Sequence, residues 1–238
     1  MKEFELMKDN WSDKTFAEEW DTKDSQGHPT RGEQLDILTS VIADNYEPGK
    51  LILDIGCGSG QVEKLIFEKC ADAKIVGVDS SAVMLEIAKK RLSIFEQNFQ
   101  SLQKDITALE SADLPPGTYQ TVFSVQVLHE LNTELRQALF KKVYNLLETS
   151  GLFLIMDRIK VDLETFSKPY KSVWSRLEST TSLKSADDFE GYKERIGGKE
   201  DNPGSMEEYE KLLKESGFKF AILHLHFDRA VIVGIKSS

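Results

Sequence analysis

The segment LILDIGCGSGQVEKLI, residues 51–66, constrains the fold of this chain more than any other stretch. Its first five residues are apolar apart from Asp54, and a strand of that kind is typical of the interior of a parallel sheet. Gly56, Gly58 and Gly60 follow directly, and apolar residues then return at helical spacing. Glycines permit a tight turn and a close approach of the backbone to a ligand. A ligand site is therefore expected where this strand ends.

Strand-like runs and helical patterns alternate after this segment. Such alternation predicts an α/β fold with a doubly wound, mainly parallel sheet and right-handed connections. The helix before the fifth strand is expected to end just before Gly151. The expected strands are residues 51–55, 74–79, 99–105, 119–128 and 152–157, and the expected helices include residues 61–70, 80–92 and 132–150.

The end of the chain changes this pattern. Ser205 precedes Glu208 by three residues, which is the spacing of a capping box, and the helix it opens is expected to stop at Gly217. Two strand-like runs follow, residues 218–227 and 230–236, with only two residues between them. So short a connection requires an antiparallel hairpin. The sheet is thus expected to have seven strands and a Rossmann-like order.

Two regions lie outside the alternation, although 238 residues fit a single domain. Residues 1–50 are expected to form a helical cap, and residues 159–204 form a polar, partly helical insertion. Two interpretations of the insertion stay open: a segment that packs onto the domain, or a lid whose aromatic face walls a substrate pocket. Its apolar residues at helical spacing are Phe166, Tyr170, Trp174 and Leu177.

The composition narrows the class of partner. The formal net charge is −10, which disfavours general binding to nucleic acids, since such binding depends on clustered Lys and Arg. No apolar run reaches the length of a membrane span, and the charged start MKEFELMKDN differs from a signal peptide, so a cytoplasmic protein is expected. The two cysteines, Cys57 and Cys70, are expected to be reduced thiols.

The glycine turn and two aspartates favour one kind of cofactor. Asp79 ends the second strand, 19 residues after Gly60, near the spacing at which a carboxylate meets a ribose hydroxyl. The turn reads G-x-G-x-G, with Asp54 directly before it. A carboxylate there repels a pyrophosphate and suits a ligand with an ammonium group. S-adenosylmethionine (SAM) combines an adenosine, a sulfonium and such an ammonium.

Four motifs in succession resemble the signature of class I SAM-dependent methyltransferases: LDIGCGSG, GVDSSAVMLEIAKKR, QKDITAL and VFSVQVLHEL. The resemblance covers residues 51 to 158. It implies that Asp54 and the three glycines surround the methionine moiety and that Asp79 binds both ribose hydroxyls. It further implies contacts of Ser80 and Met84 with the adenine faces, of Asp105 and Ile106 with the adenine edge, and of Val125 and Gln126 with the region of the sulfonium.

Some of these residues have a structural alternative. Asp79 could cap the helix that starts at Ser80, and Asp105 could be a turn residue after the third strand. His224 and His226 share one face of a strand, but no third ligand accompanies them at a recognisable spacing, so no metal site is expected.

Candidates for catalysis and acceptor binding follow the fourth and fifth strands. His129 is the candidate general base, because imidazole titrates near neutral pH; the alternative is a packing role. Asp157 and Arg158 either orient a polar substrate or pair with each other. Trp20, Tyr170 and Trp174 complete the predicted acceptor contacts.

The flanking segments bear on the acceptor. Residues 28–38, residues 200–218 and the hairpin resemble methyltransferases that act on small molecules, and resemble more weakly the bacterial enzymes that carboxylate SAM for transfer-RNA wobble modification. The resemblance to those relatives implies that Arg31 of this chain lies near the cofactor tail. It also implies that Arg195 lies near the added carboxylate. The expected function is methyl transfer to an oxygen or nitrogen of a small molecule. A carboxy-SAM synthase-like enzyme and a non-catalytic SAM-binding protein are the alternatives, and the sequence leaves open whether the protein is a monomer or a homodimer.

Overall fold

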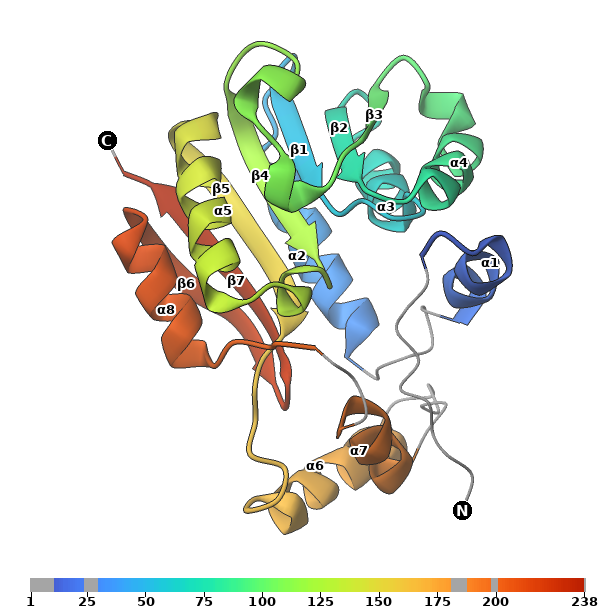
Figure 1. The fold of residues 1–238 in the computed structure, drawn as a ribbon, viewed down its shortest axis with the longest axis vertical. Coiled ribbons are helices and arrows are strands. Elements are labelled where there is room, and N and C mark those ends of the chain that lie inside the picture. The colour runs from blue at the N-terminus through green and yellow to red at the C-terminus, as the bar shows by residue number, and fades with distance from the viewer. Residues whose placement is uncertain (1–10, 24–29, 181–187, 198–200, 238) are drawn as a thin grey trace.

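The computed structural model describes residues 11–23, 30–180, 188–197 and 201–237. Its centre is one seven-stranded sheet with the order β3-β2-β1-β4-β5-β7-β6 (Figure 1). The strands are β1 Leu51–Ile55, β2 Lys74–Asp79, β3 Phe99–Gln103, β4 Tyr119–Val125, β5 Leu147–Arg158, β6 Phe218–His226 and β7 Arg229–Lys236.

The pairing confirms the expected fold class. The strands β3, β2, β1, β4 and β5 run parallel to their neighbours, whereas β7 is antiparallel to both β5 and β6. The order of connection reverses between β1 and β4, because the chain goes from β1 outward to β2 and β3 and then returns to β4 on the other side. Ligands bind at such a switch point, at the carboxyl ends of the strands.

Helices cover both faces of the sheet (Figure 1). On one face Phe140 and Tyr209 pack with Phe153 of β5, and on the other Leu38 and Phe67 belong to the cluster that includes Ile52 of β1. The helices are α1 Lys14–Lys23, α2 Arg31–Asn45, α3 Gln61–Lys69, α4 Ala82–Arg91, α5 Thr133–Leu146, α6 Ser167–Thr180, α7 Phe189–Gly197 and α8 Met206–Glu215.

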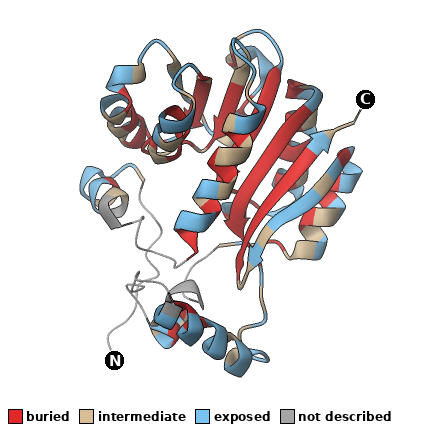
Figure 2. Cartoon of the chain, turned by 180° about the vertical axis from the view of Figure 1, so that it is seen from behind, coloured by how far each residue is buried: buried red, intermediate tan, exposed pale blue. Residues whose placement is uncertain are grey.

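The insertion has a small core of its own. Trp174 of α6 and Phe189 and Tyr192 of α7 form a buried cluster, with Tyr170 and Phe227 packed against it. Phe227 belongs to the turn between β6 and β7, so the insertion is attached to the end of the hairpin (Figure 2). None of the helices in the part of the chain that the structure describes is long and apolar enough to cross a membrane.

Two expected boundaries are wrong. The helix α5 ends at Leu146, and Gly151 lies inside β5 rather than after the helix. The register between β4 and β5 shifts at this point and Ser150 has a φ of 66°, so residues 148–150 form an irregular start of the strand. In the hairpin, β7 begins at Arg229 and the two turn residues are Phe227 and Asp228.

Candidate cofactor site

Backbone hydrogen bonds to β2 hold the glycine turn in place. The amides of Gly56 and Cys57 both donate to the carbonyl oxygen of Val78, at 2.8 and 3.0 Å. Gly56 has a φ of +83°, and a Cβ there would lie 2.3 Å from a methyl carbon of Val127. Only glycine fits this position, because any side chain would collide with the loop after β4.

Asp79 joins this turn to the next helix. Its Oδ2 accepts a hydrogen bond from the Gly58 amide at 2.9 Å, and its Oδ1 accepts one from the Ser81 amide at 2.8 Å. Burial raises the pKa of this carboxyl, and the backbone donors partly oppose that rise. The N-cap of α4 is Ser81, whose Oγ accepts from the Met84 amide, so the alternative in which Asp79 caps the helix is wrong.

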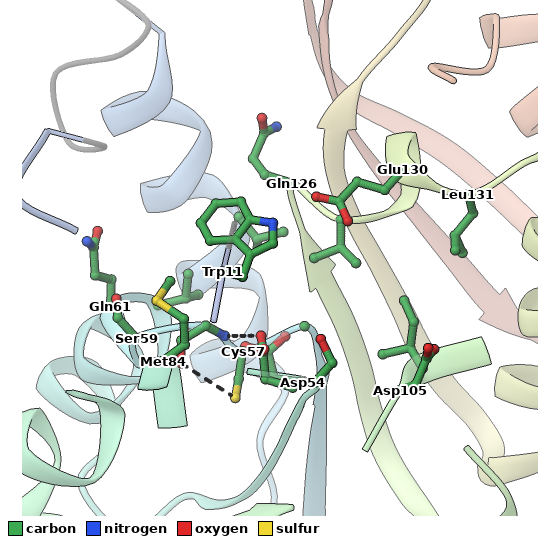
Figure 3. A pocket seen from close by; sticks show the side chains of 18 of the residues that line it. Trp11, Asp54, Cys57, Ser59, Gln61, Met84, Asp105, Gln126, Glu130 and Leu131 are labelled. Atoms are coloured by element: carbon green, nitrogen blue, oxygen red, sulfur yellow. Dashed lines mark hydrogen bonds between the residues drawn. The ribbon is translucent and has the colours of Figure 1, made fainter. Parts of the chain in front are cut away.

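A cavity of about 300 Å³ opens at the carboxyl ends of β1, β2 and β4 (Figure 3). Eleven of the twelve predicted cofactor residues line it. They are Arg31, Asp54, Gly56, Gly58, Asp79, Ser80, Met84, Asp105, Ile106, Val125 and Gln126. The twelfth, Gly60, does not line the cavity: a Cβ there would lie 3.1 Å from the Cβ of Ala88, so its lack of a side chain lets α3 pack against α4.

The cavity has further walls that the sequence did not assign. The Trp11 ring lies among the lining side chains in Figure 3, and the Trp11 carbonyl accepts a hydrogen bond from Ser81 Oγ at 2.5 Å. Nothing in the sequence separates Trp11 from the predicted Trp20, whose side chain lies outside the described residues. The other unassigned lining residues are Cys57, Ser59, Gln61, Val62, Thr107, Val127, Glu130 and Leu131.

The charges of the cavity suit the cationic end of SAM. Asp54 lines it with only 1% of its surface exposed, and its Oδ1 has no hydrogen-bond partner in the described protein. A buried oxygen without a partner is costly, and an ammonium donor would remove that cost. Asp54, Asp79 and the glycine turn therefore fit the amino-acid and ribose parts of the cofactor.

Asp105 is a turn residue that also lines the cavity. It lines the cavity, and its Oδ1 also accepts hydrogen bonds from the Thr107 amide and hydroxyl, at 2.8 and 2.7 Å. The turn fixes the carboxylate, which leaves Oδ2 to face a ligand.

His129 is not where a general base was expected. It is 7% exposed and does not line the cavity. Its Nδ1 lies 2.6 Å from Asp157 Oδ1, and its amide donates to Asp157 Oδ2 at 3.0 Å. Burial alone would raise the pKa of Asp157, but His129 and the Arg158 amide hold that pKa below its usual value. The pair ties the loop after β4 to the end of β5.

The other predicted acceptor contacts also lie away from the cavity. Asp157 and Arg158 do not pair side chain to side chain, because the guanidinium of Arg158 pairs with Asp201. Trp174 is 2% exposed, and its ring centroid lies 4.6 Å from that of Tyr192. Tyr170 packs on Phe227 at 4.6 Å. The aromatic face of α6 thus fills the core of the insertion, which corrects the prediction that it lines the described pocket.

Gln126 lines the cavity with an unusual backbone conformation. Its φ is 59°, a strained value for a residue other than glycine. Its Oε1 accepts a hydrogen bond from Arg229 Nη1, and its Nε2 is buried with no partner in the described protein. An arginine only donates, so the amide oxygen must face Arg229, and Nε2 is left without a hydrogen-bond acceptor among the described residues.

The predicted lack of a metal site concerns His224 and His226. Among the described residues, no three His, Cys, Asp or Glu side chains gather as ligands. His224 Nδ1 instead lies 3.1 Å from Gln34 Nε2. The absence of a resident metal stays a prediction.

Comparison with known proteins agrees with this geometry. Residues 52–151 match a family model described as a methyltransferase domain. A carboxy-S-adenosyl-L-methionine synthase from Campylobacter lari is 25% identical over 216 residues, which are 87% of this chain and 86% of that protein.

Two solved structures share the fold. A magnesium protoporphyrin IX methyltransferase from Synechocystis PCC 6803 with bound SAM superposes with a TM-score of 0.57 and 18% identity, over 87% of this chain and 80% of that one. The SAM-dependent methyltransferase SibL in its apo form superposes with a TM-score of 0.59 and 16% identity, over 85% of this chain. The match spans only 55% of the SibL chain.

Fold, motif order and the family model over residues 52–151 together support a class I SAM-dependent methyltransferase. The chain is an enzyme, and SAM is its cofactor.

Proposed function

We propose that the protein transfers the methyl group of SAM to an oxygen or nitrogen of a small-molecule acceptor. The observation that carries the proposal is the cavity of about 300 Å³ at the switch point of the sheet. Carboxylates line the end that is expected to hold the cofactor. Gln126 and Val127 line the opposite end. Bound SAM supplies an electrophilic methyl group. The protein then has to align a nucleophile and exclude water.

The residues divide this work between them. Asp79 would hold the ribose, Asp54 the ammonium, and the glycine turn the backbone of the methionine part. Gln126 would donate a hydrogen bond to a polar atom of the acceptor, since Arg229 fixes the direction of its amide. His129 would act as a positioning residue, because it orders the loop that carries Gln126 and Val127.

The domain arrangement belongs to the same proposal. One domain spans residues 1–238, residues 1–50 cap the cofactor end, and residues 159–204 form a lid attached to the hairpin. Trp11 in the cavity lining and the ion pair of Arg91 with Asp21 at 2.7 Å support the cap. The pair of Arg158 with Asp201 supports the lid, since it joins the insertion to the end of β5.

Turnover with a panel of small alcohols, phenols, acids and amines tests the proposal. Formation of S-adenosylhomocysteine together with a methylated product supports it, and SAM binding without turnover of any acceptor supports a non-catalytic protein. A second candidate is carboxy-SAM synthesis, favoured by the relative from Campylobacter lari that covers most of this chain. Conversion of SAM to a heavier, carboxylated species in the presence of prephenate would identify that activity. The side chain of Arg195 lies outside the described residues, so the structure does not bear on it.

A further inference from the structure

A second buried carboxyl group lies behind Asp54. Glu63, in the first turn of α3, has no exposed surface, and Asp54 at the end of β1 is 1% exposed. The two carboxyl groups act on each other, and neither Glu63 oxygen has a hydrogen-bond donor among the described residues. Two ionised carboxylates offer only acceptors, so a hydrogen bond between them would need a proton.

Little positive charge reaches this pair from the described residues. Asp79 of β2 and Cys57 of the glycine turn face it, and the carboxylate of Asp79 adds further negative charge. Arg91 of α4 is the cation that acts on Glu63, but its own hydrogen bonds go to Asp21 and Ser59. Burial and the neighbouring carboxylates raise the pKa of Asp54 well above its usual value, and burial raises that of Glu63 to about 7. The pair titrates as a unit.

Packing does not explain the presence of Glu63. Its helix neighbours Val62, Ile66 and Phe67 are buried apolar residues, and an apolar side chain at position 63 would join them without burying a charge. A buried acidic pair is costly to the fold and is typical of a functional site. Asp54 lines the cavity, so a charged ligand there acts on the pair directly.

We propose that Glu63 is a positioning residue that shares one proton with Asp54 while the site is empty, and that this proton leaves when the ammonium end of SAM binds. The inference rests on the proposed contact of Asp54 with the cofactor. On binding, the O–H bond of the shared carboxyl breaks and its proton passes to the buffer. The ammonium N–H then replaces it as the donor to Asp54, and the pair carries two negative charges opposite one positive charge.

The affinity for SAM consequently depends on pH. A cation stabilises the fully ionised pair, so the empty protein binds more protons than the complex. Affinity rises with pH by up to about tenfold per unit while the empty pair still holds its proton, and becomes level once the empty pair has also lost it.

Calorimetry near pH 6.5 in two buffers of different ionisation enthalpy, phosphate and Tris, measures the proton directly. For SAM we expect the apparent binding heats to differ by an amount that corresponds to about half to one released proton. For 5′-methylthioadenosine, which shares the adenosine but lacks the amino-acid end, we expect no difference. Glu63→Gln can donate to Asp54 without titrating, so it should bind SAM with no proton release and a flat pH dependence. Glu68→Gln, on the exposed side of the same helix, is the matched control and should behave as the wild type.

Each outcome decides one claim. Wild-type protein that binds SAM with equal apparent heats in both buffers overturns the shared proton and leaves the cofactor site intact. Wild-type protein with no SAM binding overturns the cofactor assignment itself. If Glu63→Gln does not fold, the comparison of SAM with 5′-methylthioadenosine in the wild type still decides, since only SAM brings the ammonium.

Discussion

Truncation of Trp174 tests whether the aromatic residues of the insertion form a core or contact the acceptor. The ring is 2% exposed, packs on Tyr192, Phe189 and Phe227, and donates from Nε1 to Glu178 at 3.0 Å. Truncation of a buried aromatic side chain to alanine costs about 3 to 5 kcal/mol. The insertion has few other buried apolar residues, so we expect Trp174→Ala to open α6 and α7 locally while the sheet stays folded.

Hydrogen exchange resolved by peptide measures this opening. A loss of about 3 kcal/mol corresponds to a more than hundredfold loss of protection in α6 and α7, with β1 and β4 unchanged. The affinity for SAM should change by less than about twofold, because no described side chain of α6 or α7 lines the cavity. Phe166→Ala, at a side chain that is 51% exposed, is the control and should leave protection unchanged. Unchanged protection in Trp174→Ala together with a raised acceptor KM would refute this reasoning and place the ring on the acceptor.

Three further predictions concern the cavity and the loop beside it. Asp79→Ala should weaken SAM binding by about 1.5 to 3 kcal/mol in calorimetry, the range for hydrogen bonds to a charged group; wild-type affinity in a folded variant would contradict the ribose contact. Gln126→Asn tolerates a positive φ but shortens the amide, so it should raise the acceptor KM about tenfold with SAM affinity nearly unchanged. His129→Ala leaves Asp157 buried without its main partner and should lower the free energy of unfolding by about 1.5 to 3 kcal/mol in urea titrations. Folding lowers the pKa of Asp157 below its unfolded value of 3.8. The ionised carboxylate therefore stabilises the folded protein above pH 3.8, and this stabilisation is lost as the pH falls through the lower folded pKa. The difference in the free energy of unfolding between the wild type and His129→Ala should therefore shrink in acid.

The residues that line the cavity could largely be predicted because their signals are local. Gly56 and Gly58 adopt positive φ within a few residues of Asp54, and Asp79 lies one crossover further along the chain. A βαβ unit with right-handed connections leaves little freedom in how these residues meet. Eleven of the twelve predicted residues consequently line one cavity.

Residues whose roles depend on tertiary contacts were not predictable in the same way. His129 has the spacing of a site residue, but its partner Asp157 is 28 positions away and turns its ring from the cavity. Trp174 lies on a helical stripe that is compatible with a core or with a lid, and only the packing of α7 against it decides between the two. Glu63 lies between apolar residues of an amphipathic helix, where nothing in the local pattern shows that it faces Asp54.

The polar contacts between the insertion and the loop after β4 bear on how the acceptor is chosen. Tyr192 of α7 donates to Asp228 at 2.5 Å, Asp228 is the neighbour of Arg229 in the hairpin turn, and Arg229 holds the amide of Gln126. Tyr192, Asp228 and Arg229 are buried, and Arg229 Nε lies 3.8 Å from Asp228 Oδ1. We therefore expect the insertion to influence the direction of the Gln126 amide through these contacts. A difference in the insertion between two such enzymes would then alter the acceptor preference while the cofactor residues stay the same, which is why the acceptor is harder to infer from this sequence than the cofactor.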